Sequence, residues 1–361
     1  MNISTKLEDE KIDPEKPSGG YEWWYFDALS ADKEWSIVVI FYDGNPFSPK
    51  YIGELSKGSG SHSALPKHFP AISVSLYQNG KAEYYSFLEY GEGRFHWDEE
   101  EQTGSVGSNF FKKSIIGDEL EYELLLTQTL DSGHSINAKL KFTSQKLPED
   151  LLSHESAGEK HFWNPIQPRA RVTGSVTVEG KRMDRNILFN GDGYHDHNTG
   201  FEPMKDSFDD WYWGRFHFRD STLVYYIMNG LDGSQQHEAW LFDNESQQVL
   251  ERFDEIKLDY YAVNRFGLNT SRKLEIISST SEITIQQNKI IDSGPFYQRF
   301  MSDAIMKREG RVFPALGISE YIKPEKIYEE KYWWMVKMRL RFMEEKPHWV
   351  QKSKMLYQWT W

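Results

Sequence analysis

Short strand-like segments separated by turn signals recur along the whole chain and limit what it can fold into. Residues 35–42 form a continuous apolar, β-branched run, and residues 71–77 and 82–87 flank the dipeptide Asn79-Gly80. Asn-Gly between two such runs indicates a two-residue β-hairpin. Helical periodicity is scarce. Many short strands with turns every 8–12 residues or so are typical of barrels and sandwiches, so we predict an all-β fold with few short helices.

Further expected strands lie in both halves of the chain. They cover residues 120–126, 136–142, 171–178, 186–189, 211–218, 223–228, 238–242, 257–261, 274–278 and 282–285.

The last expected strand covers residues 336–342, where Val336 and Met338 alternate with basic side chains such as Lys337 and Arg339. Alternation of this kind predicts a strand with one apolar face and one solvated face. The alternative is a basic surface that docks on anionic lipid.

A faint internal repeat divides the chain. Glu22-Trp23-Trp24-Tyr25 precedes one strand signal, and Asp210-Trp211-Tyr212-Trp213 precedes another about half of the 361-residue chain later. Chance matching is the alternative in a chain with 13 Trp. Duplication predicts two domains, residues 21–200 and 201–361, after a mobile N-terminal tail of residues 1–20.

Composition excludes several function classes. The net charge of −13 argues against nucleic acid as a partner, because phosphate binding needs clustered Lys and Arg. The chain has no Cys, which excludes disulfides and thiolate chemistry. No apolar run reaches the ~18 residues of a membrane span, and no signal peptide is recognisable, so we expect a cytoplasmic protein. Aromatic residues make up 15%, which favours a ring-lined binding cavity or, alternatively, an aromatic-rich core without a ligand.

The densest polar cluster is the segment from Gly191 to Gly200. If its middle is extended, Tyr194, Asp196 and Asn198 share one face and His195 and His197 share the other. A structural interpretation is a polar turn whose side chains cap backbone groups.

Two chemical interpretations compete with that one. His-x-His spacing could bind a metal if His161 or His217 supplied a third ligand. Alternatively, Asp196 beside Tyr194 in an apolar cavity would have its pKa raised by desolvation and could donate a proton at neutral pH. Upstream, His161 and Trp163 also have the i, i+2 spacing that places two side chains on one face, although a His beside aromatic residues is more often a packing residue.

These motifs carry a family resemblance. Residues 22–25, the pattern Gly-Tyr-x-Asp-x-Asn-x-Gly at 193–200 and Trp-x-Trp-Gly-Arg at 211–215 resemble the carotenoid 1,2-hydratase (hydroxyneurosporene synthase) family and its lipocalin-like relatives. The resemblance implies two tandem lipocalin-like antiparallel β-barrel domains over about residues 20–361. It also implies cofactor-independent addition of water to a terminal double bond of an acyclic carotenoid.

The resemblance also implies site residues. The family's functional His-x-Trp pair matches His161 and Trp163, and its Tyr-x-Asp pair matches Tyr194 and Asp196. The pair His195 and His197 is more similar to bacterial relatives of unassigned activity than to the hydratases proper. We expect no metal, and substrate-binding roles for Trp23, Trp24, Tyr25, Asn198, Trp211, Trp213 and Arg215.

Three functions follow as hypotheses. In a hydratase, Asp196 protonates the alkene, aromatic rings face the carbocation, and His161 takes the proton that the added water releases. In a polyene or terpenoid cyclase or isomerase, the same acid acts without water. In a non-catalytic isoprenoid or lipid carrier, Tyr194 and Asp196 are paired inside the wall. All three predict an apolar small-molecule ligand and allow peripheral contact with the inner face of the membrane.

Overall fold

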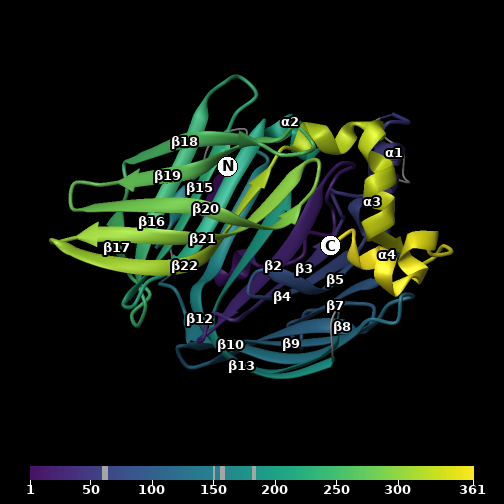
Figure 1. Ribbon diagram of the computed structural model, residues 1–361, viewed down its shortest axis with the longest axis horizontal. Coiled ribbons are helices and arrows are strands. Elements are labelled where there is room, and N and C mark those ends of the chain that lie inside the picture. Colours follow the sequence, from purple (N-terminus) through teal and green to yellow (C-terminus); the bar gives the residue numbers. More distant parts are fainter. Residues whose placement is uncertain (59–63, 149–150, 155–158, 181–183) are drawn as a thin grey trace. The chain divides into compact units, whose positions relative to one another are not determined.

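Two structural units make up the chain. The computed structural model describes residues 1–58, 64–148, 151–154, 159–180 and 184–361 (Figure 1). The first unit comprises Met1–Met204 and Tyr328–Trp361, and the second comprises Lys205–Ile327. Each unit is built on one curled, almost entirely antiparallel sheet, and the predicted all-β class with few short helices is confirmed.

The sheet of the first unit has the strand order β23-β5-β4-β3-β2-β13-β12-β10-β9-β8-β7-β6, with β1 attached to β11 and β12. Only the β1–β12 and β23–β5 pairs among its described strands are parallel. Its strands are β1 (Asn2–Ser4), β2 (Tyr21–Ser30), β3 (Trp35–Asp43), β4 (Ala71–Gln78), β5 (Lys81–Glu89), β6 (Phe95–Asp98), β7 (Thr103–Val106), β8 (Asn109–Ile116), β9 (Glu119–Thr129), β10 (Ser135–Gln145), β11 (Ser153–His154), β12 (His161–Glu179), β13 (Asp184–Gly200) and β23 (Leu340–Phe342).

The predicted hairpin between β4 and β5 is confirmed. Asn79 and Gly80 have φ values of 50° and 63°. Positive φ at both central residues defines the type I′ turn, whose twist matches that of the two strands, and Asn and Gly tolerate this conformation best.

The sheet of the second unit has the order β17-β16-β15-β14-β22-β21-β20-β19-β18. Its strands are β14 (Asp210–His217), β15 (Ser221–Asn229), β16 (Gln235–Asp243), β17 (Val249–Arg252), β18 (Glu255–Val263), β19 (Asn269–Ile277), β20 (Ser281–Ser293), β21 (Tyr297–Arg308) and β22 (Arg311–Ile322).

The two sheets share one topology. In the first, β2 lies between β3 and β13; in the second, β14 lies between β15 and β22. The series β3-β4-β5 corresponds to β15-β16-β17, and β12-β10-β9-β8 corresponds to β21-β20-β19-β18. This common order supports the internal repeat.

The repeat also holds for the two faces of the equivalent strands β2 and β14. Trp24 and Phe26 of β2 belong to the hydrophobic core of the first unit, and Tyr212 and Phe216 of β14 belong to that of the second. Because side chains alternate along a strand, Trp23, Tyr25 and Asp27 of β2 point to the face opposite the core. Trp211, Trp213 and Arg215 of β14 do the same, and all six are buried.

Short helices connect the strands. The α-helices are α1 (Pro49–Leu55), α2 (Met204–Ser207), α3 (Trp333–Arg339) and α4 (Lys354–Gln358), and the 3₁₀ turns are η1 (Leu7–Asp9), η3 (Pro66–His68), η4 (Pro324–Tyr328), η5 (Glu330–Tyr332) and η6 (Trp349–Lys352). None of the described helices is long and apolar enough to cross a membrane. The expected cytoplasmic location stays a prediction.

The N-terminal segment differs from the expected mobile tail. Residues of β1 pair with β11 and β12, and the Met1 ammonium donates to Glu159 Oε2 at 2.7 Å. Lys16 is buried in ion pairs with Glu22 and Asp43. The charged composition that suggested disorder is accommodated because buried charges here meet opposite charges.

The C-terminal segment also differs from expectation. Residues 333–339 form α3, and only Leu340–Phe342 extend as β23. Val336 and Leu340 are both buried, and their i, i+4 spacing places two side chains on one face of a helix as well as of a strand, so alternation alone did not distinguish the two. Residues 328–361 return to the first unit, so the second unit ends at Ile327 rather than at residue 361.

Candidate functional site

The polar segment at 191–200 is the second half of strand β13 and not a turn. Asp196 lies opposite Tyr25 of β2 on one side and Pro165 of β12 on the other. The side chains of this segment therefore alternate between the two faces of the sheet, as predicted. Tyr194, Asp196 and Asn198 share the face that points away from the core.

Asp196 is held by three hydrogen bonds. Its Oδ2 accepts from Trp163 Nε1 at 2.8 Å and from the Tyr194 hydroxyl at 2.7 Å, and its Oδ1 accepts from Asn198 Nδ2 at 2.9 Å. Asp196 is 4% exposed. The Tyr-x-Asp and His-x-Trp segments that sequence reasoning paired thus meet in space, through the Trp163 indole.

His161 lies on the same strand as Trp163, two residues earlier. It is fully buried, and its Nδ1 is 2.9 Å from the Tyr21 hydroxyl. Burial lowers the pKa of His161 to about 3, against a smaller opposing effect of a hydrogen bond with Asn198. The imidazole is therefore neutral at physiological pH. Asn198 connects it to Asp196.

Aromatic rings surround these polar groups. Trp23 stacks on Tyr21 with ring centroids 5.3 Å apart and lies 5.9 Å from the His161 ring. Tyr25 meets Tyr194 edge to face at 6.1 Å. The π faces of such rings attract positive charge.

The absence of a side chain at Gly200 leaves room for the Tyr21 ring. A Cβ at Gly200 would lie 2.1 Å from the Tyr21 ring. Only glycine therefore lets Tyr21 pack across the end of β13 and reach His161. Sequence reasoning identified neither Tyr21 nor its role, because Tyr21 and His161 are 140 residues apart.

His195 and His197 point to the core side of the sheet. His195 Nε2 is 2.9 Å from Glu10 Oε1, and His197 Nε2 is 2.7 Å from Glu22 Oε1. Burial lowers the pKa of His195, while Glu10 partly offsets that effect. Among the residues that the structure describes, no three His, Asp or Glu side chains gather in a way that could hold a metal ion.

Glu10 carries the charge of this core-side cluster. Burial acts to raise its pKa, but Lys113 and His195 lower it to about 2. Lys113 Nζ lies 3.1 Å from Glu10 Oε2, and the Tyr122 hydroxyl donates to the same oxygen. Through these contacts Glu10 holds the N-terminal segment against the core side of the sheet.

Trp24 does not join the candidate site. Its ring packs in the core against His197, with centroids 4.8 Å apart, and against Phe95 at 5.2 Å. Trp24 therefore lies on the face opposite Asp196, and its expected substrate-binding role stays a prediction. One residue of the Trp23-Trp24 pair must face the core because the two are adjacent on a strand.

The second unit contains a carboxylate at the repeat-equivalent position. Glu320 of β22 lies opposite Trp213, as Asp196 lies opposite Tyr25. Its Oε1 accepts from Arg299 Nε at 2.7 Å. The guanidinium also lies 5.3 Å from the Tyr297 ring. The three donors to Asp196 named above are uncharged, whereas the donor to Glu320 is the guanidinium of Arg299.

Sequence reasoning missed Glu320. Tyr25 and Trp213 are repeat partners about half a chain apart, but Asp196 and Glu320 are only 124 positions apart by their numbering. The strands and connections of the two repeats differ in length, so equivalent residues are not separated by one constant number of positions. The equivalence of Asp196 and Glu320 is visible only in the register of the strands that they face.

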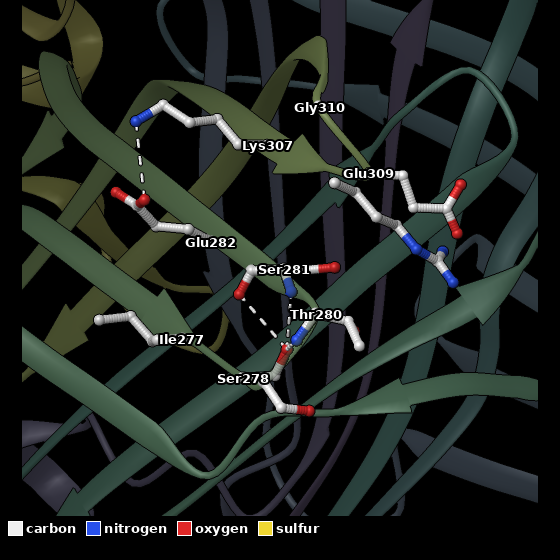
Figure 2. A pocket seen from close by; sticks show the side chains of 10 residues that line it. Ile277, Ser278, Thr280, Ser281, Glu282, Lys307, Glu309 and Gly310 are labelled. Carbon is white, nitrogen blue, oxygen red and sulfur yellow. Dashed lines mark hydrogen bonds and ion pairs between the residues drawn. The ribbon is translucent and has the colours of Figure 1, made fainter.

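Two surface hollows lie away from these residues. A pocket of about 370 Å³ in the second unit lies at the ends of the β19–β20 and β21–β22 hairpins and includes the Glu282–Lys307 ion pair (Figure 2). One of about 650 Å³ in the first unit lies beside α1 and includes Lys50 and Glu345, paired at 2.7 Å. Neither contains a predicted site residue.

Known proteins resemble this chain along most of its length. Residues 39–340 match the family described as carotenoid hydratase CrtC. Hydroxyneurosporene dehydrogenase of Chlorobaculum tepidum is 30% identical over 340 residues, covering 90% of this chain and 88% of the relative. Acyclic carotenoid 1,2-hydratase of Rubrivivax gelatinosus is 27% identical over 250 residues, covering 66% of this chain and 55% of the relative.

A solved structure supports the fold. The crystal structure of an AttH-like protein from Nitrosomonas europaea aligns with a TM-score of 0.60 at 15% identity, covering 88% of this chain and 96% of the other. The lipocalin-like fold expected from the motifs is confirmed.

Proposed function

The chain belongs to the carotenoid hydratase CrtC family, and from this membership we propose that it is a hydratase that adds water to a terminal double bond of an acyclic carotenoid or related isoprenoid. The proposed reaction is acid-catalysed and uses no cofactor. The observation that carries the proposal is the buried Asp196 carboxyl, hydrogen-bonded by Trp163 and Tyr194 on a face rich in aromatic rings.

Asp196 is the proposed general acid. Its proton adds to the less substituted carbon of the trisubstituted alkene, and the π electrons of the double bond form the new C–H bond. A tertiary carbocation and an aspartate result. The hydrogen bonds from Trp163 and Asn198 stabilise the carboxylate that this step leaves behind. The anion also lies near the developing cation, which lowers the barrier.

Aromatic side chains are proposed to face the cation. Trp23 and Tyr25 lie on β2 beside Asn198 and Asp196 and on the same face. Their π faces stabilise positive charge without offering a nucleophile that would trap it.

His161 is the proposed proton acceptor. Water adds to the cation through an oxygen lone pair, and the resulting oxonium loses a proton to the imidazole. In the required tautomer the proton lies on Nδ1, which donates to the Tyr21 hydroxyl, and Nε2 takes the proton of the oxonium. An oxonium is strongly acidic, so an imidazole with a pKa of about 3 is basic enough. His161 then releases its proton to solvent water, and solvent returns a proton to Asp196.

Product mass tests the proposal. The purified protein is incubated with an acyclic carotenoid in detergent micelles, once in H₂¹⁸O and once in D₂O, and the product is weighed. A hydratase gives a mass gain of one water, with ¹⁸O in the hydroxyl and one deuterium on the neighbouring carbon. A product of unchanged mass indicates a cyclase or isomerase. Tight binding without a product indicates a carrier. Either result contradicts hydration.

A further inference from the structure

The last 31 residues carry a charge opposite to that of the rest of the chain. Residues 331–361 contain seven Lys or Arg and two Glu, a local charge of +5, which leaves −18 for the other residues. Both acids lie near basic residues from elsewhere in the first unit: Glu345 pairs with Lys50 at 2.7 Å and Glu344 approaches Arg94 at 4.0 Å. Of the basic residues, Arg341 pairs with Asp131 at 2.7 Å and Lys331 pairs with Glu329. The positive charge that faces solvent in this segment therefore includes the exposed Lys352 and Lys354.

Large apolar side chains are exposed in the same segment. Trp349 is 66% exposed, Met355 62% and Trp359 74%. Met355 and Trp359 have i, i+4 spacing along α4 and so project from one side of it. The opposite side is anchored, because Tyr357 is buried and its hydroxyl donates to the Arg339 carbonyl at 3.0 Å.

Exposed lysines stand among these rings. Lys352 ends η6 and Lys354 begins α4, and both are exposed. Trp349, Lys352, Lys354, Met355 and Trp359 are here called the C-terminal Trp–Lys surface. Figure 1 shows α4, in yellow, close to α3 and to the C-terminus.

We propose that the C-terminal Trp–Lys surface docks the protein on the face of an anionic lipid bilayer. Trp rings settle at the level of the lipid headgroups, and Lys near an anionic surface is attracted to it. Because the remaining residues carry a net charge of −18, they do not favour such a surface, and this segment supplies the electrostatic attraction.

This inference goes beyond the proposed function and does not depend on it, although an apolar substrate that resides in lipid would give such docking a purpose. A soluble partner with an acidic groove and a second copy of this chain are the competing occupants. The measurement below distinguishes them.

Vesicle flotation tests the docking. The full chain is mixed with vesicles of phosphatidylcholine alone or with about one third phosphatidylglycerol, at low and at 0.5 M salt. We expect binding only to anionic vesicles, weakened by salt, and a blue shift of Trp fluorescence as the rings leave water. Failure to bind anionic vesicles overturns the proposal.

Paired variants locate the surface. Lys352→Glu with Lys354→Glu should weaken partitioning by about tenfold or more, since each Lys contributes about a factor of five near an anionic membrane. Lys11→Glu with Lys81→Glu changes net charge equally at exposed sites elsewhere and should have a much smaller effect. Equal effects of both pairs would mean that net charge alone governs binding, which contradicts a defined surface.

The aromatic contribution has its own control. Trp349→Ser with Trp359→Ser should abolish the fluorescence shift and weaken binding, whereas Tyr260→Ser with Tyr261→Ser, at 66% and 54% exposure, should not. Thermal melting checks that each variant is folded. If the Trp variants instead convert a dimer into a monomer in analytical ultracentrifugation while vesicle binding persists, the surface is a self-association interface and the proposal is wrong.

Discussion

The indole of Trp163 donates a hydrogen bond of 2.8 Å to Asp196 Oδ2, although the two residues lie on different strands and 33 positions apart. The bond links the His-x-Trp and Tyr-x-Asp segments into one arrangement. The position of the proposed acid therefore depends on the register between β12 and β13 as well as on its own strand.

Asp196→Asn should abolish turnover. The amide keeps the shape and much of the hydrogen bonding of the carboxyl but cannot protonate an alkene, so we expect kcat to fall by at least about a hundredfold with ligand binding retained. Turnover and ligand fluorescence quenching measure the two effects. Asp192→Asn is the matched control: Asp192 lies on the same strand, accepts from Arg169 at 2.9 Å and is not at the site. Retained activity in Asp196→Asn contradicts the acid role.

Trp163→Phe should lower kcat by about tenfold and leave KM almost unchanged. The substitution keeps an aromatic ring and removes only the donor to Asp196, so the carboxylate formed in the transition state loses one hydrogen bond. Tyr194→Phe removes the second donor to the same oxygen and should act similarly. Steady-state kinetics of the two single variants and the double variant check this. If the double variant matches wild type, these bonds are structural only.

Stability should fall as pH falls, in part because of His161. Its pKa is lowered from 6.5 to about 3 by burial, so the unfolded chain binds a proton at pH values where the folded chain does not. The stability associated with neutral His161 is complete above about pH 6.5 and decreases as pH falls toward 3. Near pH 5.5 the loss is about 1 kcal/mol. Urea unfolding at pH 7.5 and 5.5 should show a smaller decrease for His161→Gln than for wild type. Equal decreases would contradict a neutral buried imidazole.

Glu320 should prove structural. Arg299→Met leaves a mostly buried carboxylate without its 2.7 Å partner and should destabilise the second unit by about 3–5 kcal/mol. Arg299→Met combined with Glu320→Leu removes both charges and should recover much of that loss. Chemical denaturation measures both. Glu320→Gln should keep kcat within a few fold of wild type, in contrast to Asp196→Asn. A loss of turnover as large as that of Asp196→Asn would assign chemistry to the second repeat.

Gly200→Ala should disturb the site although it replaces none of the polar side chains in it. The added methyl would lie 2.1 Å from the Tyr21 ring, so the ring must move away from His161. We expect a cost of about 1–3 kcal/mol and reduced turnover. Gly53→Ala in α1 is the control, because its nearest neighbour would be 3.9 Å away and Ala favours a helix. Unchanged stability of Gly200→Ala would show that Tyr21 has room to shift.

The sequence predicted much of the fold because the signals involved are local. The Asn79-Gly80 turn depends on two residues, and the separation of Asp196 from His195 depends on alternation along one strand. The segment 336–342 shows the limit of such signals, because its spacing suits both a strand and a helix. In the structure the segment divides: residues up to Arg339 form α3, and Leu340–Phe342 form β23.

By itself the sequence determined the all-β class, the repeat of its Trp-rich strands and the division of the 191–200 segment into two faces. Each follows from periodicity within one stretch of chain. Only the tertiary structure decided that Trp163 donates to Asp196, that Tyr21 reaches His161, and that Glu320 occupies the equivalent position in the second sheet. Those contacts depend on the register between separate strands, several of them distant in sequence. That register is fixed when each sheet packs around its core.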